Sequence, residues 1–172
     1  MSTVVENAGR SAAGGAGQYL SFFLAGEEYG LEILKVREII GILPVTRVPR
    51  TPQYVRGVIN LRGKVIPIID LRLKLSMEAV EDDRETCIIV VQANSVQMGI
   101  VVDKVSEVLD IVESEIEEAP EFGASIDTAY LLGLAMSGGR VRLLLDIERV
   151  LTREEYAALQ GAEGEGTEDE GA

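Results

Sequence analysis

Residues 30–42, GLEILKVREIIGI, return 69 positions later as residues 99–111, GIVVDKVSEVLDI. A gap-free internal repeat predicts a duplicated architecture in which each copy forms an equivalent structural unit. Positions that agree between the copies are expected to serve the fold, and positions that differ to serve function. The residues that recur are Gly30 and Gly99, Lys35 and Lys104, Val36 and Val105, Glu38 and Glu107, and Ile42 and Ile111.

The repeat extends on both sides of this stretch and predicts the same strands in each copy. Residues 18–25 align with 87–94, and both are apolar runs of strand length that end at a turn, so each copy opens with a hairpin. Gly57 and Gly63 align with Gly133 and Gly139 at an offset of 76, and each copy closes with a second hairpin. The seven extra residues fall in the 113–128 loop. Each copy thus supplies about five short apolar strands, a number that favours an all-β protein of two five-stranded barrels.

Helix is predicted in only two places. Residues 51–54 read as one turn, with Thr51 as the N-cap before Pro52. Residues 152–159 read as a longer helix, because Thr152 and Glu155 have the spacing of a capping box.

The chain divides into three segments by composition. Residues 1–17 are rich in Gly and Ala and are expected to form a flexible N-terminal tail. Residues 18–159 are expected to form the folded domain, as two barrel subdomains of interleaved strands. Residues 160–172 carry five acidic residues and almost no apolar ones, so we expect a disordered acidic tail.

Composition excludes several classes of function. With 16 basic and 29 acidic residues, a net charge of −13 disfavours nucleic-acid binding. The chain has no histidine and one cysteine, Cys87, which excludes a Cys/His metal cluster and an internal disulfide. We expect Cys87 to be a buried strand residue of a protein in a reducing cytosol. No nucleotide-binding glycine motif, signal region or apolar run of transmembrane length is present. We therefore expect no cofactor and no metal.

A hydrolase that uses paired carboxylates is not excluded by counting acidic residues. The polar residues, however, fall mostly at turns and at alternating strand positions, a pattern typical of a solvated face. The sequence therefore favours a binding protein over an enzyme.

The copies diverge most at the turn of the closing hairpin. Asn60 and Arg62 in the first copy are replaced by Met136 and Gly138 in the second. A guanidinium beside a turn glycine can present a rigid fork to a partner's carboxylate or carbonyl groups. The alternative is that Asn60 and Arg62 satisfy local backbone groups or pair with Asp70.

Two further features admit both a structural and a functional interpretation. The shared lysines and glutamates of the repeat either stabilise the fold or flank a groove between the barrels, with Val36 and Val105 facing it. Phe122, in the inserted loop, either packs into the core or anchors a partner.

These residues resemble the CheW family of chemotaxis coupling proteins. The resemblance covers about residues 18–159. Its most specific part is GVINLRGKVIPIIDLR, residues 57–72, supported by EEYG at 27–30, ILKV at 33–36, GIVVDKV at 99–105 and APEF at 119–122.

The resemblance implies two SH3-like barrels sharing a core, and a cytoplasmic, non-catalytic adaptor associated with membrane receptor arrays through its partners. Those partners would be the helical-hairpin tip of a chemoreceptor, the regulatory domain of the histidine kinase CheA, and other CheW copies in rings. The implied receptor-binding residues are Val36, Glu38, Gly57, Asn60, Arg62, Val105 and Val108. The implied kinase-binding residues are Ile39, Gly41, Ile42 and Phe122.

The alternative within the family is a regulatory or scaffold paralogue that binds only the kinase or other couplers. A detached regulatory domain of a larger kinase is a weaker interpretation, because no kinase or receiver sequence accompanies the repeat.

Overall fold

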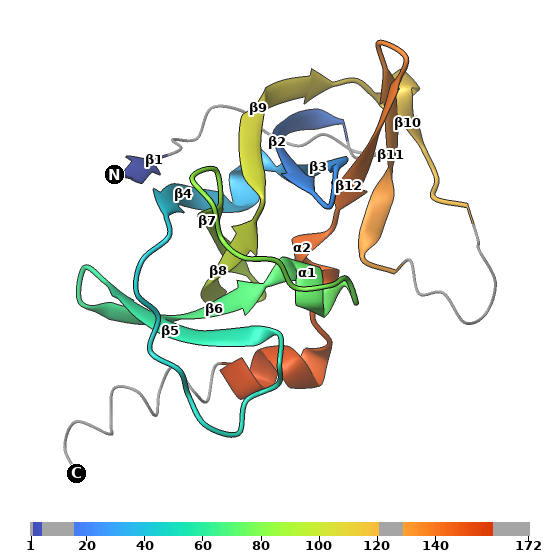
Figure 1. Cartoon of the computed structure of the whole chain (residues 1–172). Helices are drawn as coiled ribbons and strands as arrows, with labels where there is room; N and C mark the ends of the chain where they lie inside the picture. Colours follow the sequence, from blue (N-terminus) through green and yellow to red (C-terminus); the bar gives the residue numbers. More distant parts are fainter. Residues whose placement is uncertain (1, 5–15, 121–128, 160–172) are drawn as a thin grey trace.

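A computed structural model describes residues 2–4, 16–120 and 129–159 of the chain as two six-stranded sheets (Figure 1). The first sheet has the strand order β1-β4-β7-β8-β6-β5, and the second has β10-β11-β12-β3-β2-β9. This confirms the all-β prediction. The strands are β1 (Ser2–Val4), β2 (Gly17–Leu24), β3 (Glu27–Glu32), β4 (Val36–Gly41), β5 (Val55–Leu61), β6 (Lys64–Asp70), β7 (Cys87–Ala93), β8 (Val96–Val102), β9 (Lys104–Ile111), β10 (Ile116–Glu117), β11 (Leu131–Ser137) and β12 (Arg140–Leu145).

The two copies of the repeat exchange their opening hairpins. The first sheet combines β4, β5 and β6 of the first copy with the β7–β8 hairpin of the second. The second sheet combines β9 to β12 of the second copy with the β2–β3 hairpin of the first. Two parallel ladders make these joins, β6 with β8 and β12 with β3. Neither sheet can therefore form from one copy alone.

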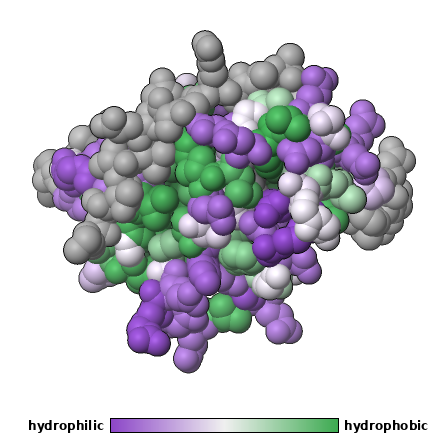
Figure 2. Space-filling model, turned by 90° about the horizontal axis from the view of Figure 1, so that it is seen from above, coloured by the Kyte–Doolittle hydropathy of each residue, from purple (hydrophilic) through white to green (hydrophobic). Residues whose placement is uncertain are grey.

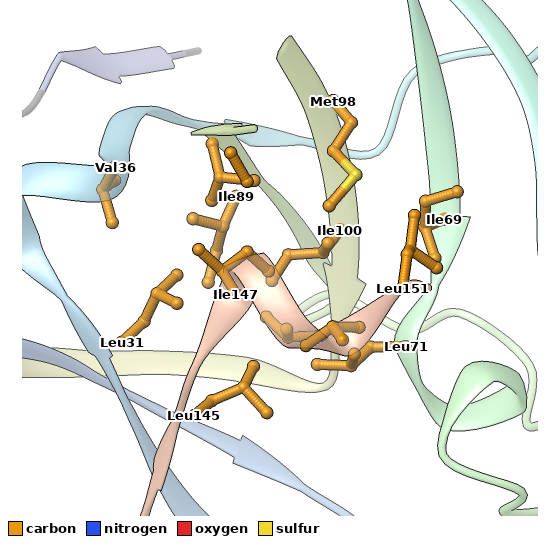
Figure 3. Packing of buried hydrophobic residues seen from close by; sticks show 14 of the residues in the cluster. Leu31, Val36, Ile69, Leu71, Ile89, Met98, Ile100, Leu145, Ile147 and Leu151 are labelled. Carbon is orange, nitrogen blue, oxygen red and sulfur yellow. The ribbon is translucent and has the colours of Figure 1, made fainter. Parts of the chain in front are cut away.

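Each sheet packs against a hydrophobic cluster on both of its faces. One face contributes to a large central cluster that both sheets share, and Figure 3 shows side chains of this cluster from both converging, among them Leu31, Ile89 and Leu145. The other face of the first sheet encloses a smaller cluster drawn from β4, β5, β6, β7 and β8, including Ile40 and Ile59. Since β4 and β5 lie far apart in the strand order, the sheet must curve to bring them together. The second sheet encloses its own small cluster around Tyr19 and Leu144.

The glycines that open the repeat are explained by this curvature. A Cβ on Gly99 would lie 2.6 Å from Ile88 Cγ2 and 2.7 Å from Ile68 Cδ1 in the small cluster of the first sheet. A Cβ on Gly30 would lie 3.0 Å from Leu144 Cδ2 in the small cluster of the second sheet. The repeated glycine therefore leaves room for neighbouring strands inside each curved sheet.

Two short helices that the sequence analysis did not predict follow Asp70 and Asp146, which are equivalent positions of the repeat. The Asp70 side chain caps α1 (Leu71–Lys74), and the Asp146 side chain caps α2 (Ile147–Val150). Each aspartate amide also donates to a tyrosine carbonyl 2.7 Å away, from Asp70 to Tyr54 and from Asp146 to Tyr130. The closing strands β6 and β12 therefore end at Asp70 and Leu145, because the aspartate ends the strand and starts a helix. The inserted loop also contains the short strand β10.

The C-terminal helix is confirmed with its predicted cap. Residues 153–159 are helical, the Thr152 hydroxyl accepts from the Glu155 amide at 3.1 Å, and the Glu155 carboxylate accepts from the Thr152 amide at 2.7 Å. The same carboxylate accepts from the Tyr54 hydroxyl at 2.6 Å and from Lys74 Nζ at 3.0 Å. Glu155 therefore fixes this helix to α1 and to the segment that leads into β5.

The predicted helical turn at residues 51–54 is wrong. The segment forms a hydrogen-bonded turn in which the Val55 amide donates to the Pro52 carbonyl. Thr51 does not cap a helix, because its hydroxyl donates to the Val48 carbonyl at 2.8 Å.

The N-terminal prediction is also incorrect in part. Ser2–Val4 form β1, which pairs antiparallel with β4 at the edge of the first sheet. A β-branched pair, Thr3 and Val4, suits a strand position, and an unpaired sheet edge offers it hydrogen-bonding groups. The rest of the predicted N-terminal tail up to residue 15, and the acidic tail at 160–172, lie outside the described residues.

An ion pair joins the two sheets at their corner. Arg72, in α1, donates through Nε and Nη2 to Asp103, at 2.9 and 2.6 Å. Asp103 Oδ2 also accepts from the Ala25 amide in the β2–β3 turn. Burial acts to raise the pKa of Asp103, but the hydrogen bonds from Arg72 and Ala25 outweigh it and hold that pKa below its usual value.

The Glu155 contacts predict how stability depends on pH. Burial alone would raise the pKa of Glu155, but its hydrogen bonds outweigh that effect and lower the pKa to about 2. The stabilisation by Glu155 is therefore fully present above about pH 4.5 and is lost as the pH falls toward 2.

Glu155→Gln should lower the free energy of unfolding by about 1–2 kcal/mol at pH 7, measured by urea denaturation. It should also make the fall of that free energy below pH 4.5 less steep. Glu154→Gln, on the same helix but exposed, is the control. Equal effects of the two substitutions would contradict the assignment.

Candidate protein-docking site

A buried carboxylate and an exposed arginine form the centre of the candidate site. Glu38 lies in β4 with 3% of its surface exposed, whereas 64% of the Arg62 side chain is exposed at the tip of the β5–β6 hairpin. Arg62 Nη1 donates to Glu38 Oε2 at 3.1 Å, and Nη2 donates to Glu38 Oε1. This two-pronged pair fixes the guanidinium plane at the protein surface.

The hairpin turn holds Arg62 in an unusual backbone conformation. Leu61 pairs with Lys64, and the two residues between them have positive φ, 53° at Arg62 and 87° at Gly63. A two-residue turn of this kind matches the strand twist, but arginine enters the left-handed region at a cost of about 1–2 kcal/mol. The ion pair with Glu38 helps to offset that cost.

The two sequence interpretations of Asn60 and Arg62 have different outcomes. Asn60 Oδ1 accepts from the Gly63 amide at 2.8 Å, so this residue satisfies a local backbone group. Arg62 pairs with Glu38 and not with Asp70, whose carboxylate lies 3.1 Å from Arg56 Nη2.

The second copy lacks the corresponding arrangement. Glu107, the counterpart of Glu38, is exposed on β9, and Gly138 occupies the position of Arg62. The two shared lysines also differ in their contacts, since Lys35 pairs with Glu148 and Lys104 with Glu85. A pair between the repeat glutamate and an arginine of the hairpin turn is therefore specific to the first sheet, whereas in the second sheet the buried Glu28 of β3 pairs with Arg140 and Arg142 of β12.

Gly57, in β5 of the same hairpin, has a structural role because the chain crosses closely over it. Its φ is +144°, and a Cβ there would overlap the Thr46 carbonyl oxygen and lie 2.8 Å from Val45 Cγ1. The crossing segment is held by paired hydrogen bonds between Thr46 and Val58. Gly133, its counterpart, lies against the backbone of β10 in the same way. A Cβ on Gly133 would lie 2.7 Å from the Glu117 carbonyl oxygen.

The expectation that Val36 and Val105 face an open groove is incorrect for Val36. Val36 is only 3% exposed and belongs to the central cluster, against which half-buried Val105 also packs. A register shift in β4 between Val36 and Glu38 turns Val36 inward, and simple strand alternation does not predict this. Val108, on β9, is 43% exposed.

The candidate kinase-binding residues lie at the end of β4. Ile39 is half-buried, while Gly41 and Ile42 are exposed. Ile42 leads into a groove of about 620 Å³ that it shares with exposed Leu43 and Val80. Phe122, the remaining candidate, lies outside the described residues.

The groove contains charged residues that the sequence interpretation missed. Arg56 crosses it, donating from Nη1 and Nη2 to Asp82, both at 2.9 Å, and from Nε to Asp70 at 3.2 Å. The sequence did contain a signal for a specific role of Arg56, because the second copy has Leu132 at the equivalent position. An apolar wall beside an ion-pair network is suited to a protein partner.

Exposed hydrophobic side chains occur on both sheets. Figure 2 shows hydrophobic residues gathered centrally on one face, with hydrophilic residues around them. Contiguous exposed apolar groups mark binding surfaces, and Ile42, Leu43 and Val80 line one groove together. The exposed hydrophobic side chains are Leu34, Ile42, Leu43, Val80, Val108, Val112, Leu132, Met136 and Val141.

The described residues contain no group of three or more His, Cys, Asp or Glu side chains placed to hold a metal ion. Burial raises the pKa of the half-buried Cys87 thiol, which a hydrogen bond with the Val105 backbone only partly opposes. Within the same part of the chain, no helix has the length and apolar character needed to cross a membrane.

Comparison with known proteins identifies the family. The model of the CheW-like domain matches residues 18–155. The chain belongs to the CheW family. It is 47% identical over 140 residues to the chemotaxis protein CheW of Klebsiella aerogenes, covering 81% of this chain and 84% of that protein. It is 35% identical to the chemotaxis protein CheW of Rhizobium meliloti, covering 90% and 99% of the two chains.

A solved structure supports the same assignment. The crystal structure of the scaffolding protein TtCheW from Thermoanaerobacter tengcongensis superposes with a TM-score of 0.72 at 34% identity, covering 77% of this chain and 90% of that one. As a CheW family member, this chain is a non-catalytic chemotaxis scaffold. The two-sheet architecture is accordingly shared with a CheW scaffolding protein.

Gly57→Ala tests whether this glycine is needed for the stability of the fold. The clash with Thr46 and the positive φ should lower the free energy of unfolding by about 2–4 kcal/mol in urea denaturation. Gly41→Ala is the matched control, because a Cβ there meets nothing within 4 Å, and its effect should stay within about 0.5 kcal/mol. A Gly57→Ala protein of unchanged stability would refute the structural role.

Proposed function

We propose that this chain couples the cytoplasmic tip of transmembrane chemoreceptors to the histidine kinase CheA, binding the two partners with different surfaces. The observation that carries the proposal is the Glu38–Arg62 pair, which fixes an exposed guanidinium in the turn of the β5–β6 hairpin, at a position that is glycine in the second copy. A duplicated scaffold with one specialised edge fits a protein that joins two different partners. Through these partners the chain would associate with membrane receptor arrays.

The receptor surface is proposed to consist of Glu38, Asn60, Arg62, Val105 and Val108, with Gly57 and Val36 supporting it from below. Arg62 offers a charged contact and the exposed Val108 an apolar one. An amphipathic helical hairpin has both polar and apolar side chains that could meet them. The nearly complete burial of Val36 makes it a supporting residue.

The kinase surface is proposed to consist of Ile39, Gly41, Ile42 and Phe122. Ile42 adjoins the groove crossed by Arg56, where exposed Leu43 and Val80 extend the apolar area. A CheW-like regulatory domain of the kinase would contact this sheet end, and other CheW copies would occupy equivalent positions in rings.

Arg62→Asp tests the receptor contact. It removes the exposed guanidinium and places a second carboxylate beside Glu38, so receptor binding and receptor-dependent kinase activation should fall at least tenfold, while circular dichroism still shows a folded protein. Arg140→Asp is a matched control, since Arg140 is 59% exposed and lies 3.1 Å from the buried carboxylate of Glu28 in the second sheet. Its effect on receptor binding should be small.

Undiminished kinase activation by folded Arg62→Asp protein would refute the role of this residue. If the wild-type chain binds the kinase but no receptor, the paralogue that serves only the kinase or other couplers is the better description.

Phe122→Ser tests the second kinase contact. An aromatic anchor lost from the inserted loop should leave binary binding to the receptor normal and impair cooperative array formation with receptor and kinase, measured by sedimentation of the ternary complex. Normal arrays would place this aromatic side chain in the core.

A further inference from the structure

The outer edge of β4 is occupied by the N-terminus of the same chain. β1 pairs antiparallel with β4, with Ser2 opposite Ile40, Thr3 opposite Ile39, and Val4 opposite Glu38. Figure 1 shows β1 beside β4 at the end of the first sheet. Because β7 pairs with the other edge of β4, residues 38–40 have neighbours on both sides.

This pairing breaks the symmetry of the repeat. β9 is the counterpart of β4, and it is the last strand of the second sheet in the part of the chain that the structure describes. Of these two equivalent strands, β4 alone carries an added strand on its outer edge among the described residues. That strand lies on the two residues, Glu38 and Ile39, that connect the proposed receptor and kinase surfaces.

The added strand is poorly suited to permanent attachment. It has only three residues and contacts no strand other than β4 in the sheet order. Short strands gain few hydrogen bonds, and each hydrogen bond offsets only part of the conformational entropy lost by ordering its residues. Protection of an otherwise open sheet edge is a common role for such a strand.

We propose that β1 is an intramolecular competitor that covers the outer edge of β4 until the CheA regulatory domain displaces it. The displacing group is a β-strand edge of the partner domain, which takes over those backbone hydrogen-bonding groups of residues 38–40 that point away from β7. This inference rests on the proposed kinase contact at Ile39, Gly41 and Ile42. Gly41 and Ile42 lie beyond the described pairing with β1 and offer the partner its first point of contact.

The test compares the full chain with a variant that lacks Ser2–Val4. Removal of β1 should tighten binding of the isolated CheA regulatory domain about three- to tenfold. The reason is that the apparent affinity is reduced in proportion to the fraction of molecules whose β4 edge is uncovered, and this fraction is small while β1 is present. Thr3→Pro should act in the same direction, because proline disfavours the pairing, and Thr3→Val, which keeps a β-branched residue, is the control. Titration calorimetry measures the affinity.

Amide hydrogen exchange at residues 38–40 supplies a readout independent of the partner. Exchange should quicken in the deletion and in Thr3→Pro but not in Thr3→Val. Equal kinase affinity in all four proteins, with exchange changed as expected, would overturn the competitor role and leave the proposed function intact. Unchanged exchange would show that β1 does not cover the edge. If neither the full chain nor the deletion binds the kinase domain, the proposed kinase contact itself fails.

Discussion

The structure depends on the exchange of opening hairpins between the two copies of the repeat. Each sheet contains strands from both halves of the chain, joined by the parallel ladders β6–β8 and β12–β3. The exchange gives each sheet two buried faces, one on its own small cluster and one on the shared cluster. A chain with few aromatic residues can thereby build an aliphatic core large enough for a stable domain.

The repeat accounts for most of the fold that could be predicted. Glycines that agree between the copies mark backbone positions with little room for a side chain. Gly30 and Gly99 lie inside the curved sheets, and Gly57 and Gly133 lie under crossing segments of the chain. The C-terminal cap was predictable from Thr152 and Glu155 because a capping box is a local interaction. The starts of α1 and α2 were also present in the sequence, as the equivalent aspartates Asp70 and Asp146.

Features set by long-range contacts were not predictable in the same way. The register shift before Glu38 sends Val36 into the core, and no local pattern reveals it. Pairing of β1 with β4 depends on an edge made available by the whole sheet. Divergence between the copies did identify Arg62 as exceptional, but the identity of its partner, Glu38, required the geometry of the hairpin.

The candidate site follows from this combination of shared and unshared positions. Shared glycines and apolar residues build two equivalent sheets, whereas Glu38 with Arg62, and Arg56 with its two aspartates, specialise only the first. Asp103 and Arg72 then hold the two sheets in one orientation. An adaptor benefits from such a body, because surfaces on one rigid scaffold keep two partners at a fixed geometry.

Residue-resolved amide hydrogen exchange on the free protein tests the interdependence of the two sheets most directly. If neither sheet can form without strands from both copies, the most protected amides of β7 and β8 should open with the same free energy as those of β2 and β3, and both should equal the global free energy of unfolding. Opening free energies that differ between the sheets by more than about 1 kcal/mol would show that one sheet persists without the other and would contradict the account.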